Sequence, residues 1–281
     1  MKVGGRKYKF TPNRNTKIVF LILLLLLVWL VTSVASCARY NLVLKGEKYV
    51  SEAVLYPEFK VRECKTPDGT PTADYFEIYP PDENKKVIYL TFDDGPSKKD
   101  TPKVLDVLKK YNVDATFFVI GKNAEKNPEI LKRMVREGHS VACHSYSHNY
   151  DVLYGNTEGF REEITKTREV VKNIIGENYA DIIRFPGGAF REERAEFKEI
   201  LIEENMPFVN WNCLTGDSET KNPVPANLLA RAKKTASKAP ENCLVMLMHD
   251  TGTKQATVDA LPGIIEYFMD LDYEFCTLTR Y

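Results

Sequence analysis

VIYLTFDDGP, residues 87–96, is the stretch of this chain from which the fold is predicted. Its first six residues are mostly β-branched or aromatic, which favours a short strand. Two adjacent carboxylates, Asp93 and Asp94, follow, and Gly95-Pro96 is typical of a turn. Because successive strand side chains point to opposite faces, the two carboxylates share a pocket only where the strand gives way to a loop. The strand end is a candidate site for chemistry; the plainer interpretation is an Asp-Gly turn that caps the next helix.

Outward from this stretch, short apolar runs alternate with segments of helical periodicity. Further strands are expected at 115–120, 139–143, 182–185, 208–211, 244–248 and 273–278, and helices after Thr101-Pro102 and at 128–137, 160–175, 191–204, 225–237 and 256–269. Such alternation predicts parallel β/α units, and about seven of them can close into a barrel. The sequence therefore predicts an α/β barrel domain over residues 85–281, with its chemistry at the carboxyl ends of the strands.

The N-terminal 84 residues have a different composition. Residues 1–17 carry six basic residues and no acidic one, and residues 18–38 are 21 residues without a charge. An uncharged run of this length can cross a bilayer, and its basic flank predicts a cytoplasmic head, so we expect a single-pass anchor in the cell membrane with the barrel on the extracytoplasmic side. A lipoprotein signal cleaved before Cys37 is the alternative. Residues 39–84, rich in proline and charge, are interpreted as a stalk.

Composition limits the classes of function. The chain has 281 residues, of which 43% are hydrophobic, enough for one sizeable core. Beyond residue 17 it holds 33 basic and 39 acidic residues, and this mildly acidic balance argues against a nucleic-acid partner. The cysteines are widely spread without a C-x-x-C pair, so no zinc knuckle or dense disulfide framework is predicted, and no partner protein is evident.

Two of the four histidines, His144 and His148, form H-S-Y-S-H just after an expected strand. A spacing of four would place both imidazoles on one face of a helical turn, where they can chelate a metal; the plainer interpretation is a pair of surface histidines. One aspartate from the Asp93-Asp94 pair completes a three-ligand set with an open position, which is typical of a catalytic metal site. The other aspartate is then free to act as a general base.

Four further residues lie at or after the ends of expected strands. His249 ends LVMLMH and is a candidate general acid, because its ordinary pKa suits proton transfer near neutral pH. Arg184 begins R-F-P-G-G and can hold a carboxylate with its fixed charge, while the backbone N–H of Gly187 can face an oxyanion. Asp217, in LTGDSE, would ordinarily be interpreted as a turn residue.

Taken together, TFDDGP, HSYSH, RFPGG, TGD and LMH resemble the five motifs of the polysaccharide deacetylase family, carbohydrate esterase family 4, in their usual order. The resemblance covers nearly all of residues 86–281. It implies a distorted (β/α)7-type barrel that hydrolyses acetyl groups of polymeric sugars. It also implies Asp93 as the general base and Asp94, His144 and His148 as ligands of a divalent metal, for which zinc is the usual expectation.

The same resemblance implies the remaining roles. His249 protonates the departing sugar amine and Asp217 tunes it; Arg184 orients the base, and Leu247 lines the acetyl pocket. One departure is visible, because relatives often have tryptophan directly after the fourth-motif aspartate, where this chain has Ser218. We expect Trp211 to stand in for that tryptophan, or the pocket to be more open.

An outward-facing domain at a bacterial surface meets peptidoglycan first, so the predicted substrate is N-acetylglucosamine in a polymeric N-acetylated glycan of the cell wall. An O-acetyl xylan esterase and a catalytically silent glycan-binding module are the alternatives. A two-metal phosphoesterase would need more ligands than four histidines allow. Neighbouring aspartates also cannot flank a glycosidic bond at the roughly 5 to 9 Å that a glycosidase requires.

Overall fold

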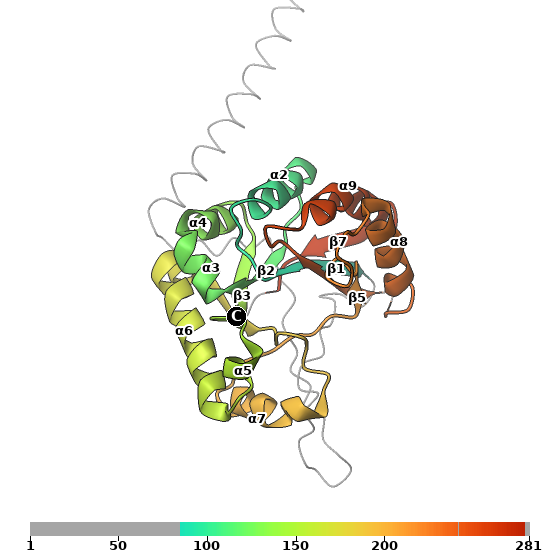
Figure 1. Ribbon diagram of the computed structural model, residues 1–281. Coiled ribbons are helices and arrows are strands. Elements are labelled where there is room, and N and C mark those ends of the chain that lie inside the picture. The colour runs from blue at the N-terminus through green and yellow to red at the C-terminus, as the bar shows by residue number, and fades with distance from the viewer. Residues whose placement is uncertain (1–84, 241, 279–281) are drawn as a thin grey trace, which may run out of the picture. The chain divides into compact units, whose positions relative to one another are not determined.

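The computed structural model describes residues 85–240 and 242–278 of the protein (Figure 1). The segments interpreted from the sequence as a basic head, an apolar run and a stalk, residues 1–17, 18–38 and 39–84, all lie outside these residues. Cys37 lies outside them too.

Seven strands and eight α-helices alternate along the described residues. The strands are β1 (Lys86–Asp93), β2 (Thr116–Ile120), β3 (Ser140–Ser145), β4 (Tyr179–Ile183), β5 (Cys213–Leu214), β6 (Cys243–His249) and β7 (Tyr273–Cys276). The helices are α2 (Thr101–Tyr111), α3 (Gly121–Lys126), α4 (Pro128–Arg136), α5 (Tyr150–Leu153), α6 (Thr157–Ile175), α7 (Ala195–Glu203), α8 (Pro225–Ala236) and α9 (Gln255–Met269), with 3-10 turns η1 (Gly176–Asn178) and η2 (Glu192–Arg194). The short helices α3 and α5 were not predicted from periodicity, because so few turns show no repeat.

β1 is the central strand of a wholly parallel sheet with the order β4-β3-β2-β1-β6-β5. It pairs with β6 over residues 87–93, with β7 over its first half and with β2 over its last three residues. A strand has only two edges, and β6 occupies one of them along its length, so β7 and β2 must share the other. The helices surround the strands (Figure 1).

The gap between β4 and β5 is bridged by an irregular segment, which bends the sheet toward closure. Ile183 donates its N–H to the carbonyl of Pro207 at 2.9 Å, and Val209 donates to Ile183 at 2.8 Å. A few residues later β5 pairs with β6 at Cys213 and Leu214. The parallel α/β barrel predicted from the sequence is therefore present in a distorted form.

The strand predicted at residues 208–211 is reduced to a single bridge, between Phe208 and Ile183, and the true strand β5 begins at Cys213. The backbone carbonyls of Val209 and Asn210 accept hydrogen bonds from the Arg184 side chain, at 3.3 and 3.2 Å. A side chain therefore occupies acceptors that a longer strand would use in its ladder, which is why periodicity alone misplaced this element.

The alternation of β1 separates two apolar clusters. Ile88, Leu90 and Phe92 belong to the core between the sheet and its helices. Val87 and Tyr89 belong to a second cluster with residues of β2, β3, β4 and β6, which fills the inside of the barrel. Because the side-chain period of a strand is two, Thr91 and Asp93 continue the inward face at the carboxyl end of β1.

The prediction of a single-pass location at the cell membrane is corrected here. Among residues 85–240 and 242–278, no helix is both long and apolar enough to span a bilayer. The longest of these, α6, has 19 residues but is amphipathic, with charged residues such as Arg161 and Glu162 along its outer face. The apolar run at 18–38, on which the prediction rested, lies outside the described residues, and the structure does not support a membrane anchor.

Candidate active site

Asp93 and Arg184 form a buried ion pair inside the barrel. Arg184 Nη1 lies 3.0 Å from Asp93 Oδ1 and donates to Thr91 Oγ1 at 2.6 Å. The Arg184 side chain is fully buried, and its other nitrogens donate to the carbonyls of Val209 and Asn210. The guanidinium group is thus fixed from three sides, and it holds one oxygen of the Asp93 carboxylate in place.

Asp94 lies next to both histidines of the H-S-Y-S-H motif. Its Oδ1 is 3.3 Å from His144 Nε2 and 3.2 Å from His148 Nε2. The backbone of Asp94 has a φ of 72°, so it has left the regular strand conformation, and its carboxylate turns away from that of Asp93. The three side chains predicted to bind the metal are therefore brought together.

The tautomer of His144 makes this cluster a set of electron-pair donors. Its Nδ1 lies 2.8 Å from the carbonyl oxygen of Arg184, which can only accept a hydrogen bond, so Nδ1 carries a proton. In the neutral form of this tautomer, Nε2 presents a lone pair toward Asp94. Fixing a ligand histidine through its other nitrogen is usual at metal sites.

The residues fit a divalent cation. The buried Oδ1 of Asp94 has no hydrogen-bond partner, and one ligand atom from each of Asp94, His144 and His148 lies within 4.8 Å of the others. Burial acts to raise the pKa of the Asp94 carboxyl, but the contact with His144 and the electrostatic attraction of the nearby imidazoles of His148 and His249 lower it overall, so the carboxylate stays ionised. Burial lowers the pKa of His148, against the attraction of Asp94, which favours the neutral form that a metal ligand needs.

The loop that carries His148 is not the helical turn predicted from the spacing. His144 is the penultimate residue of β3, and His148 follows in a loop with a φ of 55°. Ser145 Oγ accepts the N–H of His148 at 3.1 Å, and the buried Glu163 of α6 accepts the N–H groups of Tyr146 and Ser147 at 3.0 and 2.7 Å. Side-chain acceptors therefore shape the loop and bring the two rings within 5.3 Å of each other.

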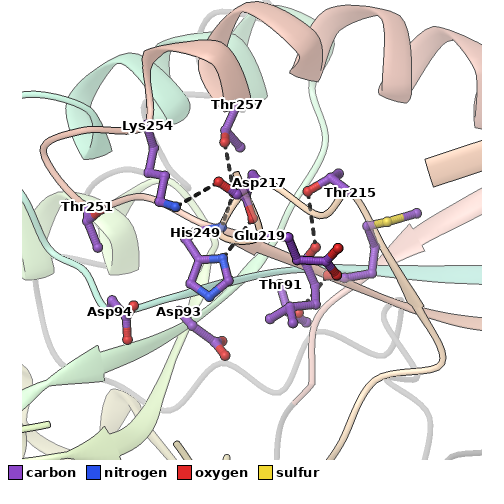
Figure 2. A network of polar contacts seen from close by, with 12 residues as sticks. Thr91, Asp93, Asp94, Thr215, Asp217, Glu219, His249, Thr251, Lys254 and Thr257 are labelled. Carbon is purple, nitrogen blue, oxygen red and sulfur yellow. Dashed lines mark hydrogen bonds and ion pairs between the residues drawn. The ribbon is translucent and has the colours of Figure 1, made fainter. Parts of the chain in front are cut away.

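His249 lies on the other side of the aspartate pair, with Asp217 behind it (Figure 2). His249 Nδ1 is 2.8 Å from Asp217 Oδ1, and the backbone N–H of His249 donates to Asp217 Oδ2 at the same distance. Thr257 Oγ1 donates to Asp217 Oδ2, and Lys254 Nζ donates to the Asp217 carbonyl. Asp217, which resembled a turn residue in the sequence, is buried and fully bonded.

These contacts set the protonation of the pair. Burial acts to lower the pKa of His249, but the bond and charge of Asp217, with the charges of Asp93 and Asp94, raise it overall. Burial acts to raise the pKa of Asp217, and the contacts from His249, Thr257 and Lys254 outweigh it and lower that pKa. An ionised Asp217 beside a readily protonated His249 suits a general acid whose reactive proton sits on Nε2.

Gly187 lies in the turn after β4 with a φ of 75°, a region that glycine enters without strain. The Tyr150 hydroxyl oxygen lies 2.8 Å from the position that a Cβ at Gly187 would occupy, so a side chain there would also collide. Within the described residues no acceptor takes the N–H of Gly187. The contact of that donor with an oxyanion stays a prediction.

Leu247 and Trp211, the other residues predicted to contact substrate, lie on strand β6 and just before β5. Leu247 is 9% exposed and stands two residues before His249, on the same face of the strand. Trp211 packs edge-on against Phe190, with ring centroids 5.2 Å apart. Their roles in an acetyl pocket, and the replacement of a tryptophan by Ser218, stay predictions.

Several residues at this site were not identified from the sequence. Glu163, Thr257 and Lys254 act through contacts with residues 16 to 40 positions away, as the loop and Asp217 contacts show. No local pattern marks such partners. Tyr150 carried a weak signal, as an aromatic residue two positions after the second histidine.

Comparison with known proteins gives the same family signal over the same region. The family model described as "Polysaccharide deacetylase" matches residues 81–200. A peptidoglycan-N-acetylglucosamine deacetylase of Bacillus cereus is 38% identical over 200 residues, covering 69% of this chain and 68% of that protein.

A solved structure, that of a Streptococcus mutans CE4 esterase, superimposes with a TM-score of 0.65 at 37% identity, covering 70% of this chain and 87% of the other. A bifunctional xylanase/deacetylase of Pseudobutyrivibrio xylanivorans is 36% identical over 205 residues, and this chain matches 31% of its length. The similarity of sequence and fold thus extends over most of the described residues.

Proposed function

This chain belongs to the polysaccharide deacetylase family, and on that premise we propose that it hydrolyses the N-acetyl groups of N-acetylglucosamine in peptidoglycan. As a polysaccharide deacetylase it is a hydrolase that acts on carbon–nitrogen amide bonds. The products are acetate and a glycan with a free amine.

One observation carries the proposal. Asp94 Oδ1 and the Nε2 atoms of His144 and His148 form a partly buried cluster of acceptors, and Asp94 directly follows the ion-paired Asp93. Acceptors so close together repel one another unless positive charge lies between them. A divalent cation bound there, for which we propose zinc, polarises a carbonyl group and lowers the pKa of a water molecule.

The proposal assigns proton transfers to residues on two sides of that cluster. Asp93, held by Arg184, takes a proton from the attacking water. The Gly187 N–H donates to the oxyanion that forms on the acetyl carbonyl oxygen. When the C–N bond breaks, His249 Nε2 gives its proton to the departing amine nitrogen, and Asp217 stabilises the charged imidazole before that transfer.

The nitrogen-linked acetyl group is favoured by the Bacillus cereus relative, which is named for peptidoglycan N-acetylglucosamine. The second candidate substrate is an O-linked acetyl group, as on xylan. It is favoured by the similarity to the relative named bifunctional xylanase/deacetylase. The two differ in what remains on the glycan after acetate leaves, an amine or a hydroxyl.

The test is acetate and free-amine release from peptidoglycan by the full chain, with acetylated xylan alongside. We expect release that a chelator abolishes and zinc restores, with amine appearing in step with acetate. Asp93→Asn should lower the rate by about 10²- to 10⁴-fold because the base is lost. Asp106→Asn, an exposed carboxylate on α2, is the matched control and should keep the wild-type rate.

Release of acetate from acetylated xylan but not from peptidoglycan would contradict the amide substrate and favour hydrolysis of O-acetyl esters. If the folded protein binds zinc and peptidoglycan but releases no acetate, the chain is not a deacetylase. It would then be a glycan-binding module.

A further inference from the structure

Arg194, the last residue of η2, is a buried charge that has no counter-charge among residues 85–240 and 242–278. The residue is 9% exposed, and its Nε has no hydrogen-bond partner. Its terminal nitrogens also make no hydrogen bond or ion pair with a described residue, yet they are not fully enclosed. A group that approaches from outside can therefore reach the guanidinium.

The charge is only partly accounted for by packing. The guanidinium carbon lies 3.1 Å from the centroid of the Tyr154 ring, a cation–π contact. A cation–π contact does not replace the hydration that a charge loses on burial. A guanidinium group that is desolvated and left without an anion is thus expected to receive one from a ligand.

Arg194 is connected to the candidate active site by a short row of aromatic rings. Tyr154 packs edge-on against Tyr150 at 5.6 Å, and Tyr150 packs in the same way against His148 at 5.5 Å. The hydroxyl of Tyr154 donates to the carbonyl of Pro186, next to the turn that bears the free N–H. The arginine therefore lies two aromatic rings away from a proposed metal ligand.

A second cation lies three residues earlier. Arg191 is exposed and forms no ion pair within the described part of the chain, and the charges of Arg191 and Arg194 both act on the Tyr150 hydroxyl. Glu192 and Glu193 lie between them, but neither pairs with Arg194 among the described residues. Positive charge thus remains available on this side of the site.

We propose that Arg194, assisted by Arg191, binds a carboxylate of the glycan, so that the enzyme prefers N-acetylated polymers whose neighbouring sugar carries an acidic substituent. The guanidinium fork matches a carboxylate through two parallel hydrogen bonds. Peptidoglycan strands from which the stem peptides have been removed carry such carboxylates, as lactyl groups, on alternate sugars, whereas chitin and acetylated xylan backbones do not. The inference rests on the proposed function and narrows its substrate class.

The test compares two tetrasaccharides, a neutral N-acetylglucosamine tetramer and a peptidoglycan fragment of equal length whose alternate sugars carry carboxylates. The quantity measured is the ratio of kcat/KM on the acidic to that on the neutral substrate. Arg194→Met should lower this ratio about tenfold, mainly through KM, as expected for the loss of a charged hydrogen bond. Arg191→Ala, at an exposed position, should lower it about threefold. Arg136→Met, an arginine on α4 distant from the site, is the control and should leave the ratio unchanged.

A substrate-side measurement does not depend on any variant folding. Converting the carboxylates of the acidic fragment to amides should remove its advantage with the wild-type protein. An unchanged ratio in folded Arg194→Met, or equal rates on the acid and its amide, would overturn the inference. If neither tetrasaccharide releases acetate, the proposed function is wrong. The inference can then still be tested by calorimetry, because it predicts that Arg194→Met binds the acidic fragment more weakly than the wild-type protein does.

Discussion

Asp217 shows how much one residue can depend on its contacts. Its two carboxylate oxygens bind the ring and the backbone of His249, and Thr257 adds a third hydrogen bond. A turn aspartate on the surface would do none of this. The residue acts by keeping His249 oriented and easily protonated.

Asp217→Asn should therefore lower the pH above which activity is lost. Asp217 raises the pKa of His249, so its removal lowers that pKa, and the proton needed by the leaving group is lost at lower pH. We expect the alkaline limb of kcat/KM to move to lower pH. The measurement is the pH profile of the two proteins on one substrate.

Thr257→Val is the matched control, because it removes one bond and keeps the carboxylate. Its alkaline limb should move much less. Coinciding profiles for wild type and Asp217→Asn would mean that His249 is not the group that titrates on that side.

Strand β1 contributes alternate side chains to the hydrophobic core and to the candidate active site. Ile88, Leu90 and Phe92 face the helices, whereas Thr91 and Asp93 face the inside of the barrel. The same strand also pairs with β2, β6 and β7. A change of register by one residue would exchange these faces, so the packing of β1 holds the base in place.

Phe92→Ala tests this element. The ring is fully buried and stacks on Phe117 with centroids 5.2 Å apart, so its loss should lower the free energy of unfolding by about 3–5 kcal/mol. Phe190→Ala, whose residue is 61% exposed, should change it by less than about 0.5 kcal/mol. Urea denaturation followed by circular dichroism measures both, and equal losses would show that β1 is not the packed centre of the domain.

At the scale of the whole molecule, Arg184 ties the walls of the barrel together. It follows β4, and its guanidinium reaches Asp93 and Thr91 on β1 and the carbonyls of the segment that leads to β5. Closure of the barrel and orientation of the base thus depend on the same side chain.

Arg184→Met should lower the free energy of unfolding by about 3–5 kcal/mol, since it leaves the Asp93 carboxylate buried and unpaired. The double variant Arg184→Met/Asp93→Asn should recover part of that loss, because the uncompensated charge is gone. Denaturation midpoints of wild type, both single variants and the double variant give the coupling between the two residues. Additive losses would contradict the ion pair.

The sequence by itself determined the parallel α/β barrel, most of its helices and the set of residues that meet at the carboxyl ends of its strands. Periodicity in a strand or helix is a local property, so TFDDGP, HSYSH, RFPGG, TGD and LMH could be assigned to strand ends without coordinates. The same motifs indicated the polysaccharide deacetylase family, and the comparisons confirm it.

Only the tertiary structure decided how these residues are held. Side-chain hydrogen bonds between distant segments shape the loop before His148, the shortened strand at Cys213 and the surroundings of Asp217. The unpaired Arg194 was equally invisible, because burial and the absence of a partner are properties of the surroundings. Sequence patterns within ten or twenty residues indicate which face of a strand or helix a side chain lies on. Which residue it contacts depends on how distant segments of the chain pack together.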